Sequence, residues 1–90
     1  RLGATIQDTE EGNGVKILEV DEGGAAAKSG LQPEDLITEI NGKKVTNVQE
    51  AREALREKNA SDNWRIQTLR GGKPVTIEVK IPKELKKSEL

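Results

Sequence analysis

The stretch that decides the fold is "AAAKSGLQPEDLITEINGKKV", residues 25–45. Three alanines followed by Gly30 suit one or two helical turns that end at a glycine in the left-handed conformation. The segment "LQPEDLITEI" (31–40) begins with a proline turn and continues as a strand. Asn41-Gly42 is a strong hairpin signal, because both residues tolerate the positive φ angles of a tight turn. "KKV" (43–45) is therefore predicted to return as a short strand.

Strands are predicted on both sides of this stretch. "LGATIQ" (2–7) alternates between apolar and polar residues, and "VKILEV" (15–20) is rich in β-branched residues. The segments 64–69 and 75–81 also alternate, and they flank a Gly71-Gly72 pair that we interpret as a turn former. They predict a closing hairpin in which the apolar residues of the second strand face the core.

One clear helix is predicted within residues 45–60. Thr46 or Asn47 can cap its beginning, and Glu50 stands three residues after Asn47, as in a capping box. Spacing of three and seven residues places three apolar side chains on one helical face: Val48, Ala51 and Leu55. The predicted fold class is α+β, mainly β. We expect a small, strongly bent antiparallel sheet or partly open barrel of five to six strands, with two helices closing its ends.

The composition limits both the size and the chemistry of the protein. Ninety residues suit one small domain, and with 32% hydrophobic and 34% charged residues its core must be thin. The net charge of −1 and a single aromatic residue give no reason to bind nucleic acid or a membrane surface directly. The absence of cysteine and histidine excludes disulfides, thiolate metal sites and histidine-based catalytic triads. We therefore expect no metal and no cofactor.

The remaining residues show no catalytic pattern. Ser29, Ser61 and Ser88 lie outside any G-x-S-x-G context. The acidic residues are scattered rather than spaced as a metal site, which indicates a solvated surface. No enzymatic activity is expected of this domain.

The central stretch resembles the middle of a PDZ domain. It is followed by a helix of the expected length, "NVQEAREALRE" (47–57), and by "LRGGKPVTIEVKI" (69–81), which resembles the closing hairpin of bacterial PDZ domains. The resemblance covers roughly residues 2–81. The strand order is similar to the permuted bacterial type that is common in HtrA/Deg-type serine proteases. Glu34 departs from the pattern, because the family often has glycine there.

The resemblance implies a peptide-binding site. Leu2, Gly3 and Ala4 occupy the position of the carboxylate-binding loop, in which backbone N–H groups converge on the terminal carboxylate of a peptide. The rest of the ligand would add as a strand between residues 4–7 and the helix over residues 48–58. The residues that the resemblance assigns to this groove are Thr5, Ile6, Val48, Arg52 and Leu55.

Each of these residues also has a simpler interpretation. Gly3 could form an ordinary bulge in an edge strand, and the aliphatic residues could belong to the core alone. Arg52 could be a solvated helix residue that pairs with a neighbouring glutamate. Val48 stands where class I PDZ domains have a histidine for a ligand Ser or Thr, and valine cannot form that bond. Ala4 is smaller than its usual counterpart, which should leave the pocket roomier or shallower.

The resemblance also implies a parent protein. Residues 1–82 would form the PDZ domain and residues 83–90 a charged tail, in a piece of a longer chain. The implied parent is an HtrA/Deg-type serine protease of the bacterial envelope or periplasm, whose protease domain is the adjacent partner. The PDZ module would bind hydrophobic C-termini or extended segments of client proteins in protein quality control. The alternative is a non-catalytic scaffold or oligomerisation domain of another envelope protein: a C-terminal-processing peptidase, a site-2 protease or a secretion component.

Overall fold

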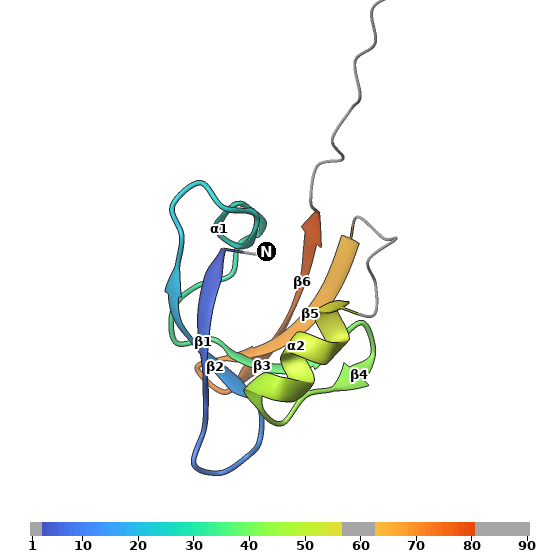
Figure 1. Cartoon of the computed structure of the whole chain (residues 1–90). Helices are drawn as coiled ribbons and strands as arrows, with labels where there is room; N and C mark the ends of the chain where they lie inside the picture. The colour runs from blue at the N-terminus through green and yellow to red at the C-terminus, as the bar shows by residue number, and fades with distance from the viewer. Residues whose placement is uncertain (1–2, 57–62, 81–90) are drawn as a thin grey trace, which may run out of the picture.

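The computed structural model describes residues 3–56 and 63–80. The elements follow the predicted order (Figure 1), and they are β1 (Ala4–Asp8), β2 (Val15–Val20), α1 (Ala25–Ser29), β3 (Leu36–Ile40), β4 (Lys43–Lys44), α2 (Val48–Arg56), β5 (Asn63–Arg70) and β6 (Lys73–Lys80). Leu2, the expected end of the helix beyond Arg56 and the expected tail over 83–90 lie outside the described residues.

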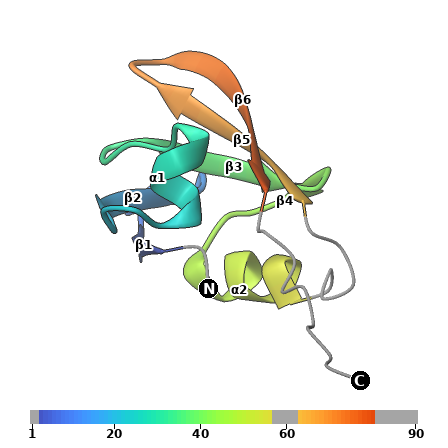
Figure 2. The same ribbon diagram turned by 90° about the horizontal axis from the view of Figure 1, so that it is seen from above.

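The described strands form one six-stranded antiparallel sheet. Its order is β1-β2-β3-β5-β6, and β4 pairs with β3 beside this path. Helix α1 packs against β6, whereas α2 packs against β1 and β3, so the two helices cover different parts of the bent sheet (Figure 2). The prediction of a bent, mainly-β sheet closed by two helices is confirmed. β1 lies at one edge of this sheet, and it pairs with β2 alone among the described strands.

The two predicted tight turns are present, and one of them does more than reverse the chain. Asn41 (φ 54°) and Gly42 (φ 81°) are both left-handed, as the turn between β3 and β4 requires. The Asn41 N–H also donates to the Arg65 carbonyl at 2.7 Å, and Asn41 Oδ1 accepts the Arg65 N–H at 2.9 Å. The side chain of Asn41 therefore ties the β3–β4 hairpin to β5.

A bulge interrupts the pairing of β1 with β2. Thr5 pairs with Glu19 and Ile6 with Ile17, which leaves Leu18 as an extra residue of β2. Leu18 follows the alternation of buried Val15 and Ile17, so it points outward and is 39% exposed. The extra residue shifts the alternation beyond Leu18, where Glu19 is also exposed and Val20 is half-buried. Alternation alone would have turned Glu19 inward and Val20 outward.

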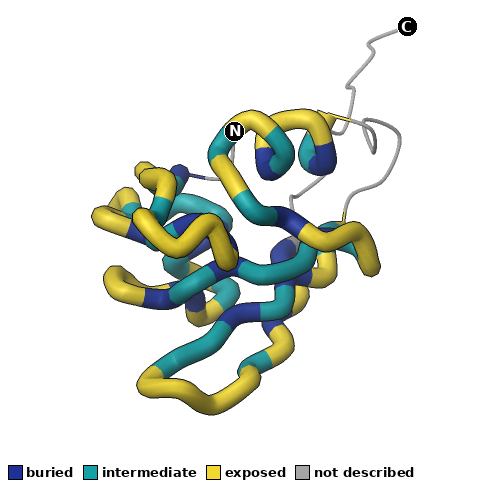
Figure 3. Tube along the Cα trace, turned by 90° about the horizontal axis from the view of Figure 1, so that it is seen from below, coloured by how far each residue is buried: buried dark blue, intermediate teal, exposed yellow. Residues whose placement is uncertain are grey.

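The core is aliphatic and thin. Figure 3 shows short buried stretches within the strands and long exposed stretches in the loops. Ile77 and Val79 of β6 are buried, as predicted for the closing hairpin. The buried apolar residues are Val15, Ile17, Ala26, Leu31, Ile37, Ile40, Val45, Ala51, Ala54, Ile66, Ile77 and Val79.

One acidic residue is buried, contrary to the expectation that the acidic residues are all solvated. Asp35 is only 1% exposed. Arg70 binds its carboxylate with two hydrogen bonds, Nε to Oδ1 at 2.8 Å and Nη2 to Oδ2 at 2.7 Å. The Gln32 N–H adds a third at 3.0 Å. This partnership is what permits a carboxylate in the core, and sequence spacing does not reveal it because the partners are far apart in the chain.

Candidate functional site

A groove separates the free edge of β1 from helix α2. We call it the β1–α2 groove, and its cavity volume is about 520 Å³. Its walls are mainly aliphatic, while the edge of β1 carries main-chain N–H and C=O groups. The lining residues are Ala4, Thr5, Ile6, Leu31, Ile37, Ile40, Val48, Ala51, Arg52, Leu55, Arg56 and Ile66.

The two walls run in opposite directions. The Val48 N–H, at the start of α2, donates to Oδ1 of Asp8, the last residue of β1, at 2.7 Å. Figure 1 shows α2 continuing from there back along β1, so the end of the helix lies toward the beginning of the strand. Asp8 therefore marks one end of the groove, and Gly3 and Ala4 mark the other.

The structure brings the predicted groove residues together. All five of them, and Ala4 of the predicted loop, line the same cavity. Ile6, Val48 and Leu55 are half-buried and also pack against the core. The two interpretations of these aliphatic residues, groove wall and core, therefore both hold.

Arg52 is exposed at the rim of the groove, one helical turn after Val48. It forms no ion pair with another described residue, so the expected pairing with a glutamate is not found within residues 3–56 and 63–80. Its guanidinium can therefore interact with solvent or with a ligand at the rim.

Gly3 is favoured by its backbone conformation, whereas its surroundings leave room for a Cβ at ordinary contact distances. Its φ is 82°, and a Cβ at this position would lie 3.4 Å from Gly24 Cα and 3.5 Å from Asp21 Cβ. The Gly3 carbonyl accepts the Asp21 N–H at 2.7 Å. The neighbours of Gly3 thus come from the loop between β2 and α1. The ordinary-bulge interpretation is wrong, because the irregular pairing lies between Thr5 and Ile6.

Sequence reasoning missed the floor of the groove. Ala51 shares a helical face with Val48 and Leu55, so its periodicity was a usable signal. The other missed residues come from β3, from β5 and from the loop after α1, and only the fold brings them under α2. These residues are Leu31, Ile37, Ile40 and Ile66.

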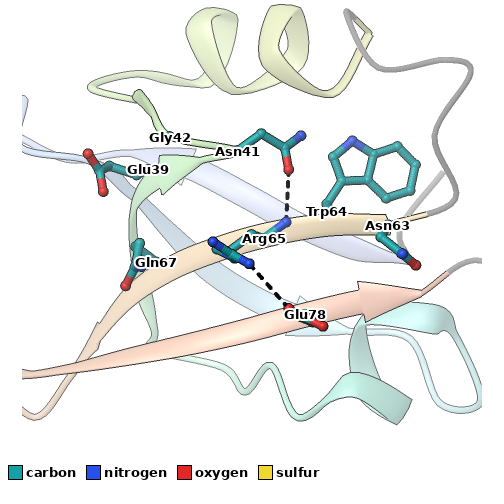
Figure 4. Close-up of a pocket in the computed structure, with 8 residues that line it drawn as sticks. All are labelled: Glu39, Asn41, Gly42, Asn63, Trp64, Arg65, Gln67 and Glu78. Carbon is teal, nitrogen blue, oxygen red and sulfur yellow. Dashed lines mark hydrogen bonds and ion pairs between the residues drawn. The ribbon is translucent and has the colours of Figure 1, made fainter.

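A second cavity of about 550 Å³ lies beside the β3–β4 turn and β5 (Figure 4). It is polar and contains an ion pair between Arg65 and Glu78, with 3.6 Å between Nη2 and Oε1. Asn41 Nδ2 and Trp64 Nε1 are buried beside it without a hydrogen-bond partner among the described residues. Apart from the Trp64 ring, its lining is polar or glycine, and it does not include the edge of β1, so the β1–α2 groove is the better candidate site.

The described residues contain neither a cluster of metal ligands nor a membrane-spanning helix. Within residues 3–56 and 63–80, no three histidine, cysteine or acidic side chains are grouped as a metal site. In the same residues, no helix is long and apolar enough to cross a bilayer.

The fold and the groove define a class of protein, and comparison with known families agrees. The family model described as "PDZ domain" matches residues 1–81. The chain therefore belongs to the PDZ domain family.

Among PDZ-containing proteins, the chain resembles HtrA/Deg-type serine proteases. It is 35% identical over 78 residues to serine protease Do-like HtrB of Bacillus subtilis, covering 86% of this chain and 17% of the protease. It is 37% identical over 78 residues to the periplasmic pH-dependent serine endoprotease DegQ of Escherichia coli, covering 83% of this chain and 17% of the endoprotease. The chain thus spans about a sixth of the length of these relatives.

The fold is also that of a solved PDZ domain. The crystal structure of the HtrA3 PDZ domain bound to a phage-derived ligand (FGRWV) superposes with a TM-score of 0.76. The match covers 89% of this chain and 82% of that one, at 18% sequence identity. At this identity the likeness concerns the fold alone.

Proposed function

We propose that this chain is a peptide-binding module that takes an extended peptide as an added strand on β1. The observation that carries the proposal is the free edge of β1, which faces an apolar helix across a groove of about 520 Å³. Main-chain hydrogen bonds to the edge supply affinity, and the aliphatic walls select side chains. The peptide-bound HtrA3 PDZ domain supports this use of the fold.

The ligand's C-terminus lies at the Gly3 end of the groove in this proposal. Leu2, Gly3 and Ala4 form the carboxylate-binding loop, and the left-handed Gly3 turns the backbone there. Exposed Arg56, at the end of α2, stands on the rim toward the same end, exposed Arg52 stands midway along the helix, and both favour a negative charge. The preferred ligand is therefore a free C-terminus with a hydrophobic last residue.

The parent protein is, by the same proposal, an HtrA/Deg-type serine protease of the bacterial envelope. Residues 1–82 form its PDZ domain and 83–90 a charged tail. The support is the identity to HtrB and to DegQ, whose name places it in the periplasm. The module would deliver client C-termini to the protease domain or regulate that domain.

The test of peptide binding compares an acid with an amide. The probe is acetyl-Ala-Ala-Ala-Val-Ala-Val, prepared with a free C-terminal carboxylate and as the C-terminal amide. The acid should bind at least about tenfold more tightly, because hydrogen bonds to a charged group contribute ~1.5–3 kcal/mol each before desolvation. The measurement is an NMR titration of the labelled domain, with shift changes expected along β1 and α2.

Two further results decide the proposal. An acid peptide that ends in Asp instead of Val should bind weakly, since the groove is apolar at its walls. Equal affinities of acid and amide, or shift changes confined to the polar cavity beside β5, would contradict the proposal.

A further inference from the structure

Asp8 connects the two walls of the β1–α2 groove. Its Oδ1 accepts the Val48 N–H at 2.7 Å, although the residues are 40 positions apart. The Val48 N–H belongs to the first turn of α2, where N–H groups have no partner inside the helix. The N-terminus of a helix favours a negative charge, so the position suits a carboxylate.

The carboxylate still has capacity for a ligand. Asp8 is exposed, and Oδ2 has no hydrogen-bond partner among the described residues. A carboxylate offers about four lone-pair sites and forms strong, short bonds with ammonium and guanidinium groups. One oxygen is thus held by the helix while the other faces solvent at the groove end.

Charge differs between the two ends of the groove. Arg56, at the end of α2, stands on the rim toward the Gly3 end, Arg52 stands midway along the helix, and both are exposed. Asp8 stands at the opposite end. A peptide with its carboxylate at Gly3 would therefore meet the cation of Arg56 toward its last residue and the anion of Asp8 further upstream.

Strand geometry gives the position that meets Asp8. A peptide whose C-terminus lies at Gly3 must run antiparallel to β1. With its last residue opposite Ala4, its third residue from the end lies opposite Ile6 and its fifth opposite Asp8. Opposite residues point to the same face of a sheet, with Cβ atoms ≈ 4.5–5.5 Å apart. The fifth side chain from the end therefore lies beside the Asp8 carboxylate.

We propose that Asp8 is a specificity-determining residue, which selects Lys or Arg at the fifth position from the C-terminus of the bound peptide. This inference rests on the peptide-binding function proposed above. The basic group binds the solvent-facing oxygen of Asp8 while the other oxygen remains on the helix N–H. A glutamate at the same ligand position is repelled.

The test uses three peptides, acetyl-Ala-Xaa-Ala-Val-Ala-Val with a free carboxylate and Xaa as Lys, Ala or Glu. Wild-type protein should bind the Lys peptide about two- to fivefold more tightly than the Ala peptide, the range of an exposed ion pair. The Lys-to-Glu ratio should reach about tenfold and shrink at high salt, because exposed charges are screened. Equal affinities for all three peptides would overturn the inference, and this comparison requires no mutant.

Variants then assign the preference to Asp8. Asp8→Asn keeps a carbonyl acceptor for the Val48 N–H but removes the charge, so it should lose the discrimination between Lys and Glu. Asp8→Lys should reverse the preference and favour the Glu peptide. Glu10→Gln removes an exposed carboxylate just beyond β1 and is the matched control, which should keep the wild-type order. Discrimination that survives Asp8→Asn, or that is lost in Glu10→Gln, would contradict the assignment.

The failure of this inference can be distinguished from the failure of the peptide-binding function. If no peptide binds, or acid and amide bind alike, the proposed function is wrong. If the acid is preferred but the fifth residue makes no difference, only the role of Asp8 is wrong.

Discussion

At the scale of single residues, Glu34 shows the cost of departing from the glycine that the family often has. Its φ is 77°, in the left-handed region that disfavours a side chain with a Cβ. The turn holds this conformation because the Glu34 N–H donates to the Ile17 carbonyl at 2.8 Å. Glu34 also forms an ion pair with Lys16, with 2.7 Å between Nζ and Oε2. This ion pair offsets little of the backbone strain, since the Glu34 side chain is 73% exposed.

Replacing Glu34 should therefore separate backbone strain from the ion pair. Glu34→Gly relieves the left-handed conformation, whereas Glu34→Ala keeps it, and both lose the bond to Lys16. The glycine variant should be more stable than the alanine variant by about 1 kcal/mol. Urea denaturation measures the difference, and an alanine variant as stable as the glycine variant would show that the turn is not strained.

At the scale of elements, helix α2 begins differently from the predicted capping box. Asn47 Oδ1 accepts the Glu50 N–H at 2.8 Å, as an N-cap should. The Glu50 carboxylate, however, accepts the Thr46 N–H at 2.8 Å rather than the Asn47 N–H. Because the Asp8 carboxylate also accepts the Val48 N–H, the first turn of α2 is fixed by residues on both sides of the groove. This fixes Val48 at the groove wall.

Val48 lines the same cavity as Ile6, opposite which the third residue from the ligand's C-terminus would lie, and this position predicts what the groove selects there. Valine offers no hydrogen-bonding group, so wild-type protein should prefer Val over Thr at the third residue from the C-terminus. Val48→His supplies a donor or acceptor and should shift the Thr-to-Val affinity ratio by about two- to tenfold toward Thr, the scale of one hydrogen bond. Peptide titration measures the ratio.

Gln49→His provides the matched control for this prediction. It adds the same side chain at the next residue, which is exposed and does not line the groove. A shift of equal size in this control, or wild-type protein that already prefers Thr, would show that Val48 does not face the ligand.

At the scale of the whole molecule, the Asp35–Arg70 pair joins distant parts of the chain through the core. It connects the loop before β3 to the end of β5, and Arg70 Nη2 also donates to the Gly30 carbonyl at 2.9 Å. Burial by itself raises the pKa of Asp35, but the hydrogen bonds from Arg70 and the Gln32 N–H outweigh burial and hold the pKa below its ordinary value.

This pair predicts how stability depends on pH. Because the folded pKa of Asp35 is lowered, its contribution is complete above the unfolded value of about 3.9 and is lost as the pH falls through the lower folded value. Asp35→Asn should destabilise at pH 7 by less than the ~3–5 kcal/mol of a fully buried pair, because Arg70 is 35% exposed and can hydrate.

The measurement is urea denaturation of both proteins between pH 7 and pH 2.5. The difference in the free energy of unfolding should begin to shrink below about pH 4, where Asp35 of the unfolded chain takes up a proton, and it should keep shrinking as the pH falls through the lower folded pKa. Glu34→Gln removes an exposed carboxylate and serves as the control, with little change expected at any pH. If the unfolding free energies of wild type and Asp35→Asn differ by the same amount across this pH range, the lowered pKa of Asp35 is contradicted.

Local patterns predicted most of the fold. The eight elements and their order follow from alternation, from one helical face and from turn residues such as Asn41-Gly42, all of which act within a few residues. The groove residues came from the family resemblance, and the structure places Thr5, Ile6 and Val48 in one cavity. The bulge at Leu18 was missed, because an extra residue in one strand is defined only by the partner strand.

The sequence by itself determined which segments become strands and helices, where the chain turns and which family it belongs to, because these depend on near neighbours and on local motifs. Only the tertiary structure decided which strand edge stays open, which residues form the floor of the groove, and that Asp8 meets Val48 and Asp35 meets Arg70. These contacts join residues far apart in the chain. They form only when the whole sheet has closed around its core, so no local sequence pattern predicts them.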